Sequence, residues 1–222
     1  MEDALRVLFL ASDPFRERAG PRLRREVRAI EAALGGGAGV ELVPCFAPRT
    51  PDLQDALLRH DPRIVHFAGH GDDRGVVYLA DAHGRRGVVA KEALAKLFGI
   101  LSEWIRVVVV NGSGTLPVVE ALSEVVDYAI GMDRPLGDAS AAAFAVAFYG
   151  ALGTGMPVRA AFDVAVSRLG GHEDAATPVL RIRPGVDAAV PLTAAPAGTP
   201  PRPRAASRWR TRVHLPFLRV QP

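Results

Sequence analysis

Cysteine, lysine and long apolar runs are all scarce in this sequence of 222 residues. Its one cysteine, Cys45, excludes an internal disulfide, and such usage is typical of proteins in a reducing compartment. The apolar run that begins at Leu5 is too short for a signal peptide, and no run is long enough to cross a bilayer. Arginine strongly outnumbers lysine, which occurs only at Lys91 and Lys96. These features predict a cytoplasmic, bacterial protein without a membrane span.

Motifs that hold phosphates, dinucleotides or metals are absent as well. No lysine follows a glycine-rich loop in the Walker pattern. Gly69-His70-Gly71 begins like a dinucleotide loop, but the next glycine, Gly75, comes one residue too late. The histidines outside residues 66–70 lie in turns, at helix ends or in the tail, without the clustering that a metal site needs. We therefore expect no cofactor and no metal.

Charge is divided unevenly along the chain. There are 27 Lys and Arg residues against 24 Asp and Glu residues, but no acid follows Asp187 and six arginines lie beyond residue 200. Without those six arginines the rest of the chain is mildly acidic. A nucleic-acid role for the body therefore lacks electrostatic support, whereas the basic tail could bind nucleic acid or an anionic membrane.

Strand and helix patterns alternate through most of the chain, which predicts an α/β fold with a mostly parallel central sheet and helices on both faces. The expected strands cover residues 6–11, 40–43, 64–69, 105–110, 128–132 and 179–182, with a hairpin made by 76–79 and 87–89. Helices are expected to begin near residues 23, 50, 91, 115, 138 and 158, with the hydroxyl of Thr50 and the carboxylate of Asp138 as N-caps.

We expect one domain over residues 1–190 and a separate tail over residues 191–222. Residues 193–207 are rich in Pro and Ala, as in an extended linker. Farther on, Trp209, Val213 and Phe217 alternate with arginines, which is typical of a strand with one basic face. Such a strand needs a sheet edge, so we expect it to dock on the body, on a sensor or regulator protein, or on a following domain. The alternative is a loose basic arm.

Residues 107–116, VVVVNGSGTL, raise the main functional question. Four valines predict a strand buried on both faces, and the strand delivers Ser113 between Gly112 and Gly114. Ligands of open α/β sheets bind at the carboxyl ends of the strands. However, the frame around Ser113 lacks both glycines of a Gly-x-Ser-x-Gly nucleophile elbow.

His70 follows another central strand and also has a glycine on each side. If the two strands are neighbours, an imidazole and a nucleophile lie at one sheet edge, which is the minimum for acyl transfer. The backbone N–H groups of Gly71 and Ser113 could then form an oxyanion hole. A turn histidine without a catalytic role remains the alternative for His70.

The combination His66-Phe67-Ala68-Gly69-His70-Gly71, then Asn111-Gly112-Ser113, then Ile130-Gly131-Met132 resembles the CHAT domain, a caspase-like family of bacterial cysteine peptidases. The likeness runs from about Leu5 to Arg183. It implies a caspase-like three-layer sandwich, a catalytic histidine at His70 and a catalytic cysteine at the position that Ser113 occupies here. The resemblance also includes Val7–Ala11, Pro14, Leu53–Leu57, Asp127–Met132, Ala142, Phe144, Phe148 and Leu152.

Serine at that position predicts an inactive or nearly inactive chain. A cysteine is partly thiolate near neutral pH, whereas a serine depends on a well-oriented base. The Cys-His dyad that the resemblance implies lacks the third group with which a Ser-His system holds its base. Two explanations stay open: an engineered variant of an active peptidase, or a natural pseudo-enzyme. Cys45 matches no position of the family's site and is interpreted as a small buried apolar residue.

Several other residues have both a structural and a functional interpretation. The resemblance associates the acid at Asp138 with the pocket for the residue before the scissile bond, where a carboxylate would pair with Arg or Lys. His66 is interpreted as a buried, hydrogen-bonded core residue. Asp13, Asp72 and Asp73 could line the cleft but are more often solvated loop acids.

Two functions are compatible with these observations. The first is a caspase-like endopeptidase that cuts a protein substrate after Arg or Lys in a bacterial defence or regulated-death system. The second is a catalytically dead module that binds a peptide or partner in the same cleft. A third, an α/β protein that binds a small ligand, is weakened by the missing phosphate loop and metal cluster.

Overall fold

The protein is described by a computed structural model over residues 4–13, 21–34, 39–81, 83, 85–112, 114–170 and 177–192. Its main sheet consists of β1 (Leu5–Ala11), β2 (Val40–Phe46), β3 (Ile64–Ala68), β7 (Val107–Asn111), β8 (Tyr128–Met132) and β9 (Pro178–Ile182). A smaller sheet consists of β4 (His70–Asp72), β5 (Val76–Ala80) and β6 (Arg86–Ala90). The helices are α1 (Pro21–Leu34), α2 (Leu53–His60), α3 (Lys91–Ile100), α4 (Leu116–Ser123), α5 (Asp138–Gly153) and α6 (Val158–Arg168), with a 3-10 turn η1 (Thr50–Asp52) before α2.

The main sheet has the strand order β2-β1-β3-β7-β8-β9. All its pairs are parallel except that of β8 with β9, which is antiparallel. Because β1 continues to β2 on one side and the chain then crosses to β3 on the other, the order reverses between β1 and β3. Ligands of such sheets bind at this reversal, beyond the carboxyl ends of the strands.

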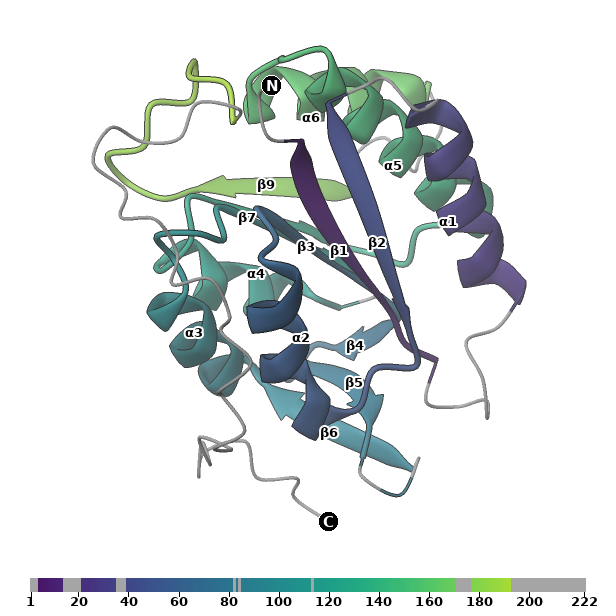
Figure 1. Cartoon of the computed structure of the whole chain (residues 1–222), viewed down its shortest axis with the longest axis vertical. Coiled ribbons are helices and arrows are strands. Elements are labelled where there is room, and N and C mark those ends of the chain that lie inside the picture. Colours follow the sequence, from purple (N-terminus) through teal and green to yellow (C-terminus); the bar gives the residue numbers. More distant parts are fainter. Residues whose placement is uncertain are drawn as a thin grey trace.

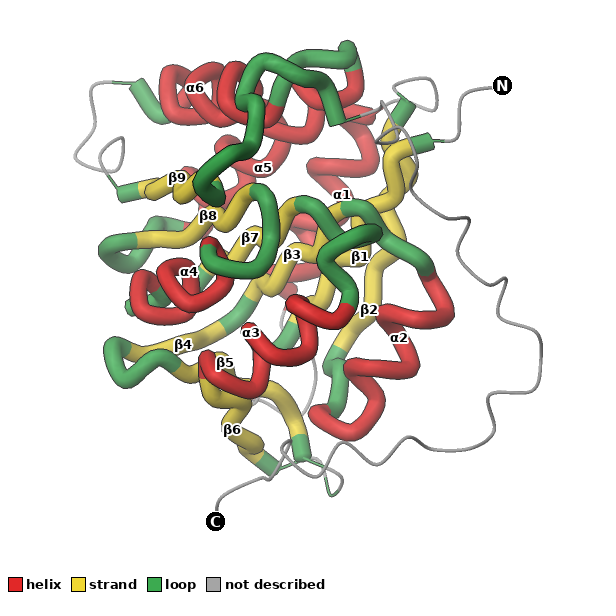
Figure 2. Tube along the Cα trace, turned by 90° about the vertical axis from the view of Figure 1, so that its left-hand side faces the viewer, coloured by secondary structure: helices red, strands yellow, loops and turns green. Residues whose placement is uncertain are grey.

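Helices cover both faces of the main sheet, so the fold has three layers (Figures 1 and 2). Alternate residues of β7 face opposite sides: Val107 and Val109 pack with α1, α5 and α6, whereas Val108 and Val110 pack with α2, α3 and α4. All four valines are buried, which confirms the strand predicted from the valine run. The prediction of an α/β sandwich with a mostly parallel sheet is also confirmed.

The small sheet follows β3 directly and lies below the main sheet in Figure 1. The predicted hairpin is confirmed, because β5 and β6 pair antiparallel from Val76–Ala90 to Ala80–Arg86. Its two ends are joined, since the Lys91 N–H donates to the Gly75 carbonyl at 2.8 Å. The third strand, β4, was not predicted: the central strand ends at Ala68, and His70 begins β4 rather than ending β3.

Two predicted helix caps are wrong. Thr50 lies in η1, and its hydroxyl donates to the Ala80 carbonyl at 3.3 Å, so it links η1 to the hairpin instead of capping a helix. The N-cap of α5 is Gly137, and Asp138 is the first helical residue, whose carboxylate binds Arg22 instead. In both cases a partner distant in sequence provides a better contact than the local backbone.

The amino end of the sheet is held by an ion cluster around one buried carboxylate. The carboxylate of Asp127, which is 1% exposed, accepts hydrogen bonds from Arg106 and, at 2.6 Å, from Arg183. These contacts hold β9 to β8 and β7 far from the carboxyl edge. No helix within the described ranges is long and apolar enough to cross a membrane. The tail from residue 193 lies outside the described residues, so its expected strand and docking remain predictions.

Candidate active site

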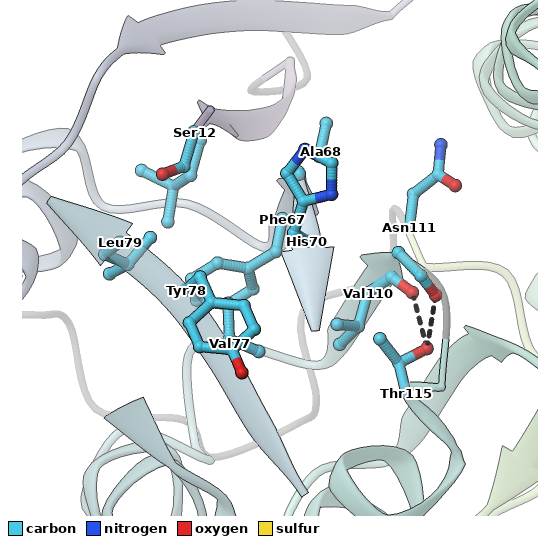
Figure 3. A pocket seen from close by; sticks show the side chains of 13 residues that line it. Ser12, Phe67, Ala68, His70, Val77, Tyr78, Leu79, Val110, Asn111 and Thr115 are labelled. Carbon is cyan, nitrogen blue, oxygen red and sulfur yellow. Dashed lines mark hydrogen bonds between the residues drawn. The ribbon is translucent and has the colours of Figure 1, made fainter. Parts of the chain in front are cut away.

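A pocket lies where the carboxyl ends of β1, β3 and β7 meet the small sheet (Figure 3). The backbone joins these three ends, because the Ser12 N–H donates to the Ala68 carbonyl at 2.9 Å and the Gly69 N–H to the Asn111 carbonyl at 3.1 Å. The site therefore lies at the reversal of strand order. Its lining consists of Leu10, Ser12, Phe67, Ala68, Gly69, His70, Val77, Tyr78, Leu79, Val110, Asn111, Gly112 and Thr115.

His70 contributes an imidazole side chain to this pocket. Its side chain is 36% exposed, and its Nε2 atom lies 3.6 Å from Oδ1 of Asp13, whose side chain is only 11% exposed. Asp13 follows β1 and His70 follows β3, so the pair spans the reversal point. A side-chain carboxylate at this distance can restrict the orientation of the imidazole ring. Of the two interpretations given for Asp13, a cleft acid or a solvated loop acid, its position beside His70 favours the first.

Thr115 anchors the turn between β7 and α4. Its hydroxyl is buried and donates to the carbonyls of Val110 and Gly112, each at 3.1 Å (Figure 3). The same hydroxyl accepts the Met132 N–H at 3.2 Å, which ties the turn to β8. Ser113, which comes between Gly112 and Gly114 in the sequence, lies outside the described residues. Register does confirm one premise of the dyad: β3 and β7 are neighbours, with Ala68 opposite Asn111.

The two glycines of the turn are explained by the backbone of β4. A Cβ atom on Gly112 would lie 3.2 Å from the Gly69 carbonyl oxygen and 3.3 Å from the Gly71 nitrogen. Gly114 has φ +68°, and a Cβ atom there would lie 2.9 Å from the Asp73 nitrogen. The glycines let the turn pack against the segment that carries His70, which brings the Gly71 amide to the turn.

Glu26 of α1 contacts the same turn from the other face of the sheet. Its side chain is buried at 5% residue exposure, and its Oε1 atom accepts a hydrogen bond from the Asn111 side-chain amide at 3.2 Å. Burial raises the pKa of Glu26 to about 7, although Arg22 and the Asn111 hydrogen bond act in the opposite direction. Glu26 was missed in the sequence because it is a single acid among the apolar residues Leu23 and Val27, and no motif marks it.

Asp138 lies at the exposed start of α5, where its carboxylate accepts a hydrogen bond from Arg22 at 3.0 Å. The two side chains are 64% and 36% exposed, so water screens the pair and its contribution to stability is small. Arg22 lies one helical turn before Glu26. Asp138 thus already pairs with a guanidinium group of its own chain. The expectation from the sequence was that the arginine or lysine of a substrate would bind there.

His66 is a core residue, as predicted. It is 1% exposed, and its Nδ1 atom lies 2.8 Å from the hydroxyl of Tyr149 on α5. Burial lowers the pKa of His66 to about 3, so its ring stays neutral at physiological pH. The Phe9 ring packs beside it, with ring centroids 4.5 Å apart. His66 therefore contributes to packing beneath the site.

The remaining candidate residues, Asp72, Asp73 and Cys45, do not contribute to the pocket lining. Asp72 accepts hydrogen bonds from the Tyr78 hydroxyl at 2.8 Å and from the Arg74 N–H at 3.0 Å, which fixes the turn from β4 to β5. Asp73 is exposed. Cys45 lies within β2 and is partly buried, and burial raises the pKa of its thiol. Within the described part of the chain, no group of three or more His, Cys, Asp or Glu side chains could hold a metal.

The arrangement defines a class: an α/β sandwich with the histidine beyond one central strand and the glycine-flanked turn beyond the next. It is the fold of "the Arg specific cysteine proteinase gingipain R (RGPB)", which superposes with a TM-score of 0.57 at 10% identity over 85% of this chain. The chain spans about half of that protein, 48% of its length. Raptor of Chaetomium thermophilum gives a TM-score of only 0.39 at 10% identity, over 68% of this chain and 18% of that one.

A scan of protein families matches residues 6–184 to the CHAT domain. The chain belongs to this family, as its motifs indicated. Comparison with the curated proteins gave no match. Fold and family together establish a caspase-like peptidase fold for residues 6–184.

Proposed function

We propose that this domain is a caspase-like endopeptidase whose site uses His70 as the base and position 113 for the nucleophile, with serine there in this chain. The observation that carries the proposal is the placement of His70 beside Asp13, across a packed glycine turn from β7. The amides of Gly71 and position 113 are proposed to receive the developing oxyanion. A protein substrate is proposed, within a bacterial defence or regulated-death system in which a sensor or regulator controls the domain.

Serine at position 113 is proposed to leave the chain inactive or nearly so. A hydroxyl has no thiolate-like population near neutral pH, so attack depends fully on the base. Asp13 supports some residual activity, since a carboxylate that orients the imidazole is the third group of a Ser-His system.

Ser113→Cys is expected to create peptidase activity in this chain. The thiolate is a stronger nucleophile, and the nearby imidazole favours it. Cleavage of a peptide library and labelling by thiol-directed peptide electrophiles should be measured together, with mass mapping to separate position 113 from Cys45. If neither signal exceeds that of the unchanged chain, with its activating partner supplied, the peptidase proposal is wrong.

We further propose that Asp138 selects Arg or Lys before the scissile bond. Its exposed pairing with Arg22 is weak enough for a substrate cation to displace. In the Ser113→Cys protein, Asp138→Asn is expected to reduce cleavage after Arg by about 10-fold. Asp163→Asn is the matched control, because Asp163 is also exposed and also pairs with an arginine, Arg159, on α6. Equal losses in both variants, or equal cleavage of acidic and basic peptides, would remove this claim.

The alternative is a natural pseudo-peptidase that binds a peptide or partner in the same pocket. Serine at position 113 favours it if serine is the residue of the source gene. Under this alternative, the unchanged chain binds a peptide in the pocket, and Ser113→Cys protein binds it without cutting it.

A further inference from the structure

The turn after β7 is held from three directions. The Thr115 hydroxyl donates to backbone carbonyls of the turn itself. The backbone of residues 69–73 packs against the glycines of the turn. The third contact comes from α1, where Glu26 accepts the hydrogen bond of the Asn111 side chain. In Figure 3 the Asn111 side chain points away from Thr115, so the two contacts hold opposite sides of the turn.

Asn111 connects the segment that carries His70 with the turn that carries position 113. Its carbonyl accepts the Gly69 N–H at 3.1 Å, next to His70, and its own chain continues two residues later into position 113. A rotation of Asn111 would therefore move the turn and the start of β4 together. Its side-chain contact with Glu26 opposes that rotation.

Packing alone does not explain a glutamate at this point of α1. Its neighbours along the buried stripe are Leu23, Val27 and Ile30, all apolar and buried. A buried carboxyl in such surroundings disfavours the folded state unless it is bonded. Its hydrogen bond with Asn111 goes to the residue that leads into the proposed nucleophile position.

We propose that Glu26 is a positioning residue for the nucleophile turn: its carboxyl holds the Asn111 side chain and thereby fixes the backbone on both sides of position 113 relative to His70. The consequence for catalysis rests on the proposed peptidase function. The structural part, the ordering of the turn, does not.

Amide hydrogen exchange of the chain as it stands tests the structural part without any activity. At pH 6, Glu26→Ala should exchange about 10-fold faster in peptides covering residues 107–116, because the hydrogen bond from the Asn111 side-chain amide is lost. Glu26→Gln keeps an acceptor oxygen and should stay within about 2-fold of the parent. Glu31→Ala, at an exposed position of the same helix, is the matched control and should change nothing there.

Unchanged exchange at residues 107–116 in Glu26→Ala would overturn the proposal. So would an equal acceleration over residues 128–132, which would indicate a general loss of stability. If Glu26→Ala does not fold, Asn111→Ala removes the same contact from the other side and is judged by the same two criteria.

Kinetics in the Ser113→Cys protein test the catalytic part. Glu26→Ala should lower kcat by about 10-fold with KM within about 2-fold, and Glu26→Gln should restore most of kcat. A raised KM with unchanged kcat would place Glu26 in substrate binding and overturn the positioning role. If the Ser113→Cys protein itself shows no His70-dependent activity, the peptidase proposal fails, and hydrogen exchange alone decides the role of Glu26.

Discussion

Replacing His70 by alanine in the Ser113→Cys protein is expected to lower kcat/KM by about 1,000-fold. A positioned general base contributes about 100- to 10,000-fold, and His70 is the imidazole at the proposed nucleophile's edge of the sheet. The measurement is cleavage of the best library peptide, together with the rate at which a peptide electrophile labels the thiol introduced at position 113. Labelling at the parental rate would mean that His70 does not activate the nucleophile.

Asp13→Asn extends this experiment, with a smaller loss of about 10-fold expected in the same protein. The amide keeps the shape of the side chain but loses the charge that lies 3.6 Å from the His70 ring. The loss should fall on kcat, with KM within about 2-fold, because the change affects the orientation of the imidazole and not substrate binding. Asp73→Asn is the matched control, because Asp73 is an exposed acid close in sequence to His70. Equal losses of kcat in both variants would show that Asp13 does not hold the His70 ring.

The second large effect concerns stability. Glu26→Gln is expected to raise the free energy of unfolding at pH 8 by about 3 kcal/mol and to leave it nearly unchanged at about pH 4.5. Burial raises the pKa of Glu26 in the folded protein to about 7 from its ordinary 4.5, so the folded state holds the proton more tightly than the unfolded state. The resulting stabilisation is complete below pH 4.5 and is lost as the pH rises through 7.

Urea unfolding at the two pH values measures this difference directly. Glutamine stays neutral throughout, so it removes the cost of the ionised carboxylate and keeps an acceptor for Asn111. Glu31→Gln, on the exposed side of the same helix, should change the free energy of unfolding by the same amount at both pH values. A Glu26→Gln protein whose advantage does not depend on pH would show that the carboxyl titrates in its usual range.

The sequence predicted the main sheet well because its strands are buried on both faces and their apolar runs are continuous. Val107–Val110 is the clearest case. It did not predict β4, since His70, Gly71 and Asp72 have no strand propensity and pair only because β5 lies beside them. The same limit applies to Thr50, whose hydroxyl finds the hairpin in three dimensions instead of the local helix.

The candidate site was predicted in part. Motifs located His70 and the turn after β7. Asp13 was named as an acid that could line the cleft, but without its partner, and Glu26 was missed. Asp13 contacts His70, and Glu26 contacts Asn111. Each contact forms only when β1 or α1 packs on the sheet, because the two partners are far apart in the sequence. Asp138 was assigned a local cap, although Arg22, more than a hundred residues earlier, pairs with it. Contacts between distant segments carry no spacing signal in one sequence.

The hairpin of β5 and β6 has a consequence for how this site could diversify. Its two ends meet at the Lys91–Gly75 hydrogen bond, so the segment leaves the fold and returns to it at one place. Tyr78 and Val77 of the hairpin line the pocket, while its tip, at Asp81 and Arg85, lies at the far end. Lengthening a loop costs only about 0.6 kcal/mol for each doubling of its length. The tip of the hairpin can thus be lengthened or changed, while residues 76–80 keep the pairing with β4 that places His70.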